Sequence, residues 1–124
     1  MKNTETITDN KIFTRLYGKG KNAVSGTTVV YYRKNNLKVN RLGLTSTKKI
    51  GCAVKRNRAR RVIREAYRLL EDRLNFGYDI VIVARTKATA VPMFAVKSDL
   101  EKTFKSCGLI KVFEGLNNST DIAE

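Results

Sequence analysis

Apolar residues recur at steps of three and four between Val54 and Leu74. This spacing is typical of an α-helix that buries one face. The residues that share the predicted buried face are Ala59, Val62, Ile63, Ala66, Tyr67, Leu70 and Leu74. Within the same segment, Arg56, Arg60, Arg64 and Arg68 are each four residues apart. Residues four apart are neighbours on a helix, so we expect these cations to form a row opposite the core.

Shorter patterns predict a first helix and two strands. Thr8 or Asp9 can cap a helix that Gly18 ends, with an apolar stripe at Ile12, Phe13, Leu16 and Tyr17. Residues 19–21 then form a basic loop. Residues 27–33 are β-branched and aromatic, and residues 39–45 alternate apolar and polar positions, so both segments predict strands. A turn through Asn35 and Asn36 would join them as a hairpin.

The second half of the chain predicts one strand and one helix. Residues 79–84 (DIVIVA) form an apolar run, as in strands that are buried on both faces. Residues 85–91 predict a loop. Pro92 suits the first turn of a last helix, and Gly108 can end it. Its apolar stripe consists of Met93, Val96, Leu100, Phe104 and Cys107.

These elements, in the order α-β-β-α-β-α with room for one further short strand, predict a single small α+β domain. We expect a mixed sheet with helices packed on one face. Residues 1–7 are polar, and residues 114–124 carry three acids and no base. We therefore expect a flexible N-terminus, a folded domain over residues 8–113 and a disordered tail. If the strands flanking the basic helix are parallel neighbours, the usual crossover between them is right-handed.

The composition adds a strong positive charge. The 124 residues include 25 Lys and Arg against 11 Asp and Glu, a formal net charge of +14. This balance points to nucleic acid or an anionic membrane surface as a partner. No apolar run approaches the roughly 18 residues of a membrane span, and the first ten residues lack the apolar core of a signal peptide. We therefore expect a cytoplasmic protein without a membrane partner.

The titratable residues exclude most enzyme chemistry. The chain has no His, which excludes Ser-His, Cys-His and His-metal sites. No spacing among the 11 acids favours a two-metal site, so we expect no catalytic residue and no metal ligand in the protein. Cys52 and Cys107 form no CxxC pattern, and we interpret both as small buried residues.

Basic residues concentrate between Lys48 and Arg68, where nine Lys and Arg stand against Glu65 alone. Arg predominates, and its planar guanidinium binds phosphate oxygens two at a time. A solvated basic face is the ordinary alternative for a charged helix. Surface helices normally mix both signs of charge, however, so the stretch favours a polyanionic partner. Nucleic acid fits this description best.

The same stretch, KKIGCAVKRNRARRVIREAYR, resembles the signature of the bacterial ribonuclease P protein subunit. The core of that signature is an Arg-Asn-Arg triplet. The matching residues are Arg56, Asn57 and Arg58, followed by Arg60, Arg61, Arg64 and Glu65. The resemblance extends more loosely over residues 9–110, and it implies a left-handed crossover at the basic helix. The chain departs from the family at residues 3–10, which carry two acids and no base where members often have several Lys and Arg.

The resemblance also implies a function. The protein subunit of this family assists a catalytic RNA, which removes the 5′ leader of precursor tRNA endonucleolytically with the help of Mg²⁺. We therefore expect a catalytic RNA subunit and precursor tRNA as partners, Mg²⁺ bound mainly by RNA, no organic cofactor and no DNA. The residues expected to contact the catalytic RNA are Lys55, Arg56, Asn57, Arg58, Arg60, Arg61, Arg64 and Arg68.

A second RNA-binding surface is predicted from aromatic residues beside cations. Phe13 and Tyr17 are one helical turn apart, and Tyr31 and Tyr32 point to opposite faces of their strand. Aromatic residues at this spacing are more often core, but rings beside cations suit an unpaired strand. The resemblance implies that Phe13, Tyr17 and Tyr31 line a cleft for the 5′ leader. The predicted cleft also contains Lys19, Lys21, Lys48 and Lys49.

Two other functions stay open at this point. A general RNA-binding or ribosome-associated protein would bind tRNA equally well with and without a leader. A metal-dependent nuclease acting alone would cleave RNA in the absence of any catalytic RNA, and it would need Asp or Glu side chains for that chemistry.

Overall fold

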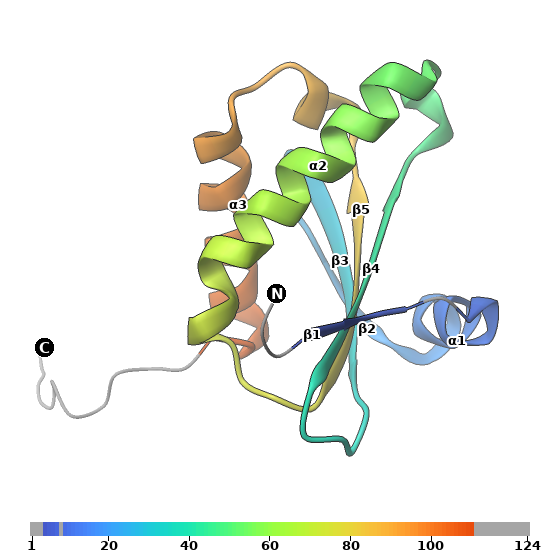
Figure 1. The fold of residues 1–124 in the computed structure, drawn as a ribbon, viewed down its shortest axis with the longest axis vertical. Helices are drawn as coiled ribbons and strands as arrows, with labels where there is room; N and C mark the ends of the chain where they lie inside the picture. The colour runs from blue at the N-terminus through green and yellow to red at the C-terminus, as the bar shows by residue number, and fades with distance from the viewer. Residues whose placement is uncertain (1–3, 8, 111–124) are drawn as a thin grey trace, which may run out of the picture.

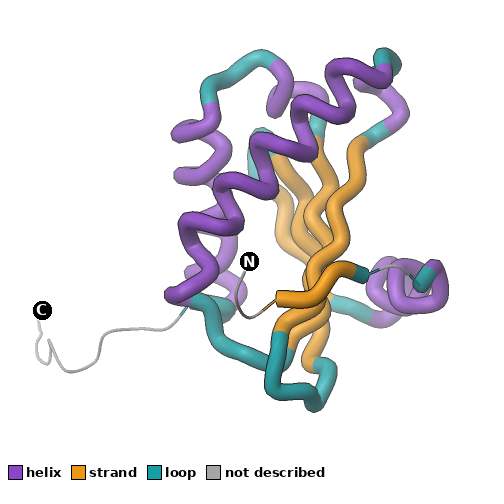
Figure 2. The backbone as a smooth tube through the Cα atoms, in the orientation of Figure 1, coloured by secondary structure: helices purple, strands orange, loops and turns teal. Residues whose placement is uncertain are grey.

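This computed structural model describes residues 4–7 and 9–110 of the chain. Within them, the strands form one five-stranded mixed sheet. The strands are β1 (Thr4–Thr6), β2 (Lys21–Val24), β3 (Thr28–Lys34), β4 (Asn40–Ser46) and β5 (Tyr78–Ala84). The helices are α1 (Asn10–Lys19), α2 (Ala53–Leu70) and α3 (Met93–Cys107). Short 3-10 turns cover Lys48–Ile50, Glu71–Arg73 and Thr86–Thr89. The sheet is seen edge-on in Figures 1 and 2, with α2 and α3 on one side and α1 on the other.

β5 is the central strand, and it separates the two strands that the sequence predicted as a hairpin. The strand order is β1-β4-β5-β3-β2, with β5 parallel to β4 and antiparallel to β3. The predicted pairing of β3 with β4 is therefore wrong. Their turn is nevertheless tight, because the Leu37 N–H donates to Asn35 Oδ1. Ile80, Val81 and Ile82 of β5 are fully buried, as the apolar run predicted. A strand buried on both faces is suited to the centre of the sheet.

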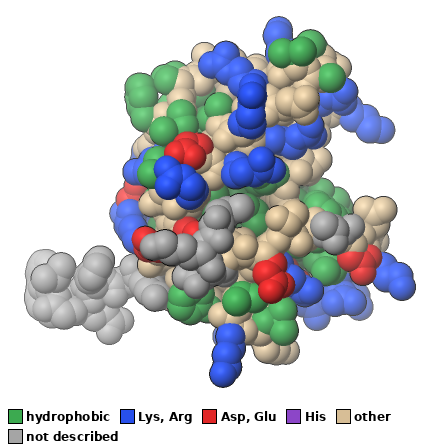
Figure 3. Space-filling view, in the orientation of Figure 1, with side chains coloured by type: hydrophobic (Ala, Val, Ile, Leu, Met, Phe, Trp, Pro, Cys, Tyr) green, Lys and Arg blue, Asp and Glu red, His purple; other side chains and the backbone are tan. Residues whose placement is uncertain are grey.

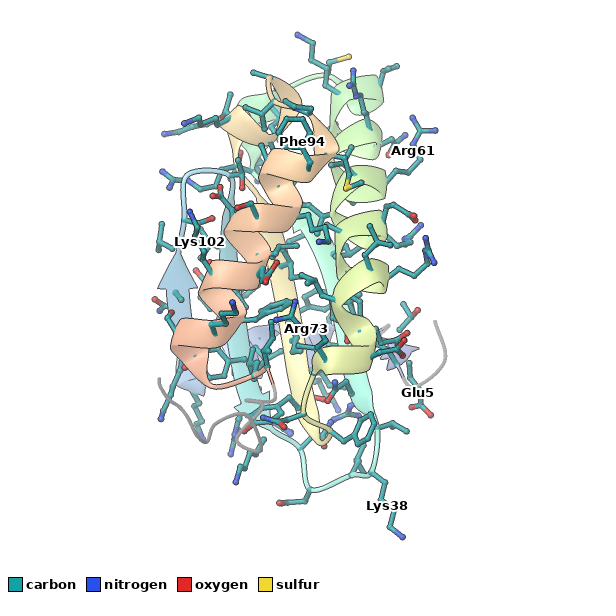
Figure 4. The ribbon with its side chains drawn as sticks, turned by 90° about the vertical axis from the view of Figure 1, so that its left-hand side faces the viewer. Glu5, Lys38, Arg61, Arg73, Phe94 and Lys102 are labelled. Carbon is teal, nitrogen blue, oxygen red and sulfur yellow. The ribbon has the colours of Figure 1, made fainter. Side chains whose placement is uncertain are left out.

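The connection from β4 through α2 to β5 is a left-handed crossover. Figure 4 shows the sheet from the side covered by α2 and α3, with β4 to the right of β5. The chain runs up β4, returns down α2 in front of the sheet and runs up β5 on the left. This hand is the one that the family resemblance implied, and it is the opposite of the usual right-handed connection.

α2 packs on the sheet and on α3 through the apolar stripe that the sequence predicted. Ala59, Ile63 and Tyr67 are completely buried, and the Tyr67 ring meets the Phe104 ring of α3 edge-on, with centroids 6.3 Å apart. Burial raises the pKa of Tyr67 to about 12. Leu74 belongs to the same core, although α2 ends before it and a 3-10 turn intervenes. Because this apolar face is fixed, the charged face of α2 is fixed as well.

α1 lies on the opposite face of the sheet from α2 and α3. The prediction of helices on one face therefore holds only for α2 and α3. Leu16 of α1 packs with Ile7 and Val81 in a second, smaller core. An amphipathic pattern shows that a helix buries a face, but it does not show which side of the sheet that face covers.

The ends of α1 show one prediction that holds and one that is wrong. Asp9 is the N-cap, and its carboxylate accepts a hydrogen bond of 2.9 Å from the Lys11 N–H. The helix does not end at Gly18 but continues to Lys19, and the Gly20 N–H donates to the Leu16 carbonyl. Residues 19–21 are therefore not a basic loop, because they pass directly from α1 into β2.

The N-terminal residues that the structure describes form a strand, and the described C-terminal part ends shortly after a helix. Residues 4–6, expected to be flexible, form β1 and pair in parallel with β4. Thr4 Oγ1 and the Tyr67 hydroxyl are 2.9 Å apart and hydrogen-bonded, which ties β1 to α2. α3 ends at Cys107, with Gly108 as its C-cap at a φ of 75°, so Gly108 stops the helix as predicted. Pro92, predicted in the first turn, is instead the N-cap. The predicted tail over residues 114–124 lies outside the described residues. None of the described helices has the length and apolar character needed to cross a membrane.

Candidate nucleic-acid interface

The exposed side of α2 carries its cations in a spiral and not in the straight row predicted. A step of four residues turns a position by about 40° around a helix with 3.6 residues per turn. Arg56 and Arg60 are therefore half-buried, whereas Arg64 and Arg68 are exposed. The other exposed cations of α2 are Lys55, Arg58 and Arg61. Figure 4 shows Arg61 extending away from the protein at the outer side of α2.

A hollow of about 460 Å³ follows this side of α2. Its lining consists of Val54, Asn57, Arg60, Arg61 and Arg64. These positions share one side of the helix because they are three or four residues apart. Arg60 donates a hydrogen bond to Asn57 Oδ1, so the Asn57 amide N–H groups remain available as donors. Lys and Arg side chains gather over α2 in the space-filling view of Figure 3.

Most cations of α2 have no carboxylate partner within the described part of the chain. The only acid in the helix, Glu65, pairs with Arg68, which lowers the pKa of Glu65. Both side chains are about half exposed, so water screens this pair. The first turn of α2 contains no acid, and the helix dipole adds positive potential there. A phosphate chain alongside α2 would therefore relieve repulsion that the free protein carries.

Three aromatic rings form a cluster on the opposite face of the sheet. The ring centroids of Phe13 and Tyr17 are 6.4 Å apart. The rings of Tyr17 and Tyr31 are 4.9 Å apart and nearly perpendicular. Tyr17 is 47% exposed, while Phe13 and Tyr31 are half-buried against the smaller core. Burial, and then the proximity of Tyr31, raises the pKa of Tyr17. The structure thus brings together the three aromatic residues singled out in the sequence.

Comparison with known proteins places this fold and its basic helix in one family. The family model for ribonuclease P matches residues 1–108. The chain belongs to the ribonuclease P protein family. It is 42% identical over 97 residues to the ribonuclease P protein component of Caldanaerobacter subterraneus subsp. tengcongensis, covering 78% of this chain and 84% of that protein.

Solved structures agree with this assignment. The ribonuclease P protein of Staphylococcus aureus superposes with a TM-score of 0.76 at 31% identity, covering 86% of this chain and 97% of that chain. The protein from Thermotoga maritima gives a TM-score of 0.74 at 29% identity, covering 82% and 96%. As a member of this family, the chain is the protein component of a ribonucleoprotein endoribonuclease in which RNA carries out the catalysis.

Asp79 of this ribonuclease P protein has a structural role in the sheet. No group of three His, Cys, Asp or Glu side chains that could hold a metal ion occurs among the described residues. The buried carboxylate of Asp79 accepts hydrogen bonds from Arg41 at 2.6 and 2.8 Å and from Asn35 at 3.0 Å. The Arg41–Asp79 ion pair joins β4 to β5, where the two residues are register partners.

The four lysines predicted to flank the aromatic cluster lie near two different ends of the sheet. Lys48 and Lys49 line a hollow with Arg85 and Lys87, beyond the last residues of β4 and β5. Lys19 and Lys21 line a pocket near the start of β5. The two ends of β5, Tyr78 and Ala84, are six residues apart, or roughly 20 Å. Lys19 and Lys21 therefore lie apart from Lys48 and Lys49, and the four lysines do not form one group.

Sequence reasoning missed several basic residues of these hollows. Arg85 and Lys87 directly follow the predicted strand DIVIVA, and Arg33 and Lys34 end β3. Their position at strand ends was a usable signal, because cations at neighbouring strand ends meet at the same edge of a sheet. The strand order, which decides which ends are neighbours, was not available from the sequence.

Cys52 is exposed, which contradicts the prediction that both cysteines are buried. It stands at the N-cap of α2, before the apolar stripe begins. The backbone N–H groups of Lys55 and Val54 lower the pKa of its thiol. Cys107, at the last residue of α3, is half-buried.

The floor of the aromatic cluster can be tested with Gly43, which lies under the Phe13 ring. A Cβ at this glycine would lie 2.7 Å from Cε1 and Cζ of Phe13. We expect Gly43→Ala to lower the free energy of unfolding by about 1–3 kcal/mol, because the ring must move. In a Phe13→Ala background we expect less than half of that penalty. Urea denaturation of the four proteins measures both values, and equal penalties in the two backgrounds would contradict the contact.

Proposed function

We propose that α2 of this ribonuclease P protein binds the catalytic RNA, while the cluster of Phe13, Tyr17 and Tyr31 binds the 5′ leader of precursor tRNA. The RNA, with Mg²⁺ held mainly by its phosphates, hydrolyses the phosphodiester bond. The protein positions the leader and reduces repulsion between the two RNAs. No protein side chain is assigned a step in the hydrolysis, and the processing is assigned to the cytoplasm.

The observation that carries the first part is the unpaired cationic side of α2. Arg58, Arg61 and Arg64 are exposed on a helix whose other face is locked into the core. Because the helix backbone is already ordered, binding a phosphate requires ordering of the Arg side chains only. Asn57 adds a neutral donor to the lining of the hollow, suited to a ribose or a base.

The second part rests on the half-buried rings. Phe13 and Tyr31 are fixed by the smaller core, and Tyr17 stands over them with almost half of its surface exposed. Rings that are fixed and partly open can stack the bases of a single strand. The sheet separates α1, which carries Phe13 and Tyr17, from α2, as Figure 1 shows, so one protein can bind both RNAs at the same time.

Reconstitution tests the proposed function. Precursor tRNA is incubated at low Mg²⁺ with the protein alone, with the catalytic RNA alone and with both. We expect rapid release of the leader only in the combined sample, because the cations of α2 offset repulsion that low Mg²⁺ leaves unscreened. Cleavage by the protein alone would contradict the assignment of the chemistry to RNA. Binding without any gain in the combined sample would instead favour a general RNA-binding protein.

The role of the aromatic cluster can be tested with two phenylalanines. We expect Phe13→Ala to weaken binding of precursor tRNA by about 1–3 kcal/mol, the value of one stacked base, and to leave mature tRNA unaffected. Phe94→Ala is the matched control, because Phe94 is 71% exposed at the start of α3 and lies outside the cluster. Binding of both tRNAs to the reconstituted particle is measured by filter retention. An equal loss for the two tRNAs on Phe13→Ala would exclude Phe13 from the leader site.

A further inference from the structure

A second pocket with aromatic walls lies on the face of the sheet opposite the cluster of Phe13, Tyr17 and Tyr31. Its volume is about 260 Å³, and it is lined by Tyr32, Tyr78 and Cys107 together with four cations: Lys19, Lys21, Arg33 and Lys34. Tyr31 and Tyr32 are consecutive in β3, so their side chains point to opposite faces of the sheet. Tyr31 therefore belongs to the aromatic cluster, and Tyr32 belongs to this pocket.

The strand register places the cations beside the rings. Lys21 of β2 is paired with Tyr32 of β3, and Lys34 of β3 is paired with Tyr78 of β5. No acid contributes to the lining, and none of the four cations forms an ion pair with a carboxylate of the described residues. Four like charges around one pocket favour an anionic ligand.

The two rings of the pocket are held in place by the main core. Tyr32, Tyr78 and Cys107 are partly buried and pack against the main core. Burial, followed by a hydrogen bond with Cys107, raises the pKa of Tyr32, so its hydroxyl carries no negative charge near neutral pH. Fixed aromatic rings beside cations are the combination that proteins use to stack single-stranded bases while following the phosphates.

We propose that this pocket is a second subsite for single-stranded RNA, in which one base packs on Tyr32 and Tyr78 while the flanking phosphates contact Lys21 and Lys34. Its volume is below the range of about 300–1,000 Å³ that is typical for drug-sized ligands, which fits one base and not a folded RNA helix. The inference rests on the proposed function only in taking RNA as the ligand. It adds a binding surface that neither α2 nor the aromatic cluster supplies.

The two cysteines of the chain provide a direct readout. Cys107 lines the pocket, whereas Cys52 is exposed at the start of α2. In a Cys52→Ser background, Cys107 is the only thiol. The probe is a single-stranded oligouridylate of about ten nucleotides, within the usual range for such sites. We expect saturating oligonucleotide to slow maleimide labelling of Cys107 several-fold, and an abasic strand of equal length to give little protection.

Paired charge reversals distinguish the effect of the pocket on binding from the effect of the net charge of the protein. We expect Lys21→Glu with Lys34→Glu to weaken oligouridylate binding about tenfold and to abolish the protection of Cys107. The control is Lys38→Glu with Lys102→Glu, which changes the net charge equally at two exposed lysines outside the pocket (Figure 4). For the control we expect a loss of less than about threefold and intact protection.

The results distinguish failure of the second subsite from failure of the proposed function. Binding of the oligonucleotide without protection of Cys107, or equal losses in the two double variants, would overturn the second subsite. The proposed function would still stand in that case, because its test is the release of the leader in the reconstituted particle. Protection of Cys107 that persists on Phe13→Ala and disappears in the pocket variant would establish the subsite as separate from the aromatic cluster.

Discussion

Packing of the apolar face of α2 on the sheet is the interaction on which the rest of the structure depends. Ala59 and Ala66 are small and completely buried, and Ile63 lies between them in the core. Each like-charged pair on a helix costs about 0.2–0.5 kcal/mol, whereas one fully buried large apolar side chain contributes about 1.5–3 kcal/mol. A few buried residues therefore outweigh the repulsion among the cations. The core keeps the helix that carries the cations in place in the free protein.

The sheet then divides the protein into two working sides. α2 lies on one face, and the cluster of Phe13, Tyr17 and Tyr31 lies on the other with α1. β5 is central to both arrangements, because Ile80 and Ile82 face α2 and α3 while Val81 faces α1. With one RNA on each face, as proposed, the protein would bridge the catalytic RNA and its substrate. The left-handed crossover is the connection that sets α2 over β4 and β5.

Local patterns in the sequence predicted most elements but not their arrangement. The apolar stripe of α2, the run at Ile80–Ile82 and the caps at Asp9 and Gly108 were all readable, because each depends on neighbouring residues. The order of the strands depends on contacts between distant segments, so β5 was not expected between β3 and β4. The side of the sheet that α1 covers was hidden for the same reason.

The candidate site was predictable to a similar extent. Helical periodicity grouped Phe13 with Tyr17, whereas Tyr31 was chosen over Tyr32 through the family resemblance, and the structure places the three rings together. The grouping of Lys19 and Lys48 around those rings required knowledge of which strand ends are neighbours. Periodicity does not supply that knowledge. The predicted straight row of arginines is wrong at Arg56, because a step of four residues is longer than one helical turn of 3.6 residues.

The salt dependence of RNA binding tests the central claim most directly. If the cationic side of α2 engages about six phosphates, the logarithm of the association constant should fall against the logarithm of the salt concentration with a slope of about −4 to −5. The measurement uses the complete chain and the catalytic RNA over a range of monovalent salt at fixed Mg²⁺. Arg61→Gln should reduce the slope by about one and leave the free energy of unfolding within about 0.5 kcal/mol of its original value. A slope near zero would contradict the account.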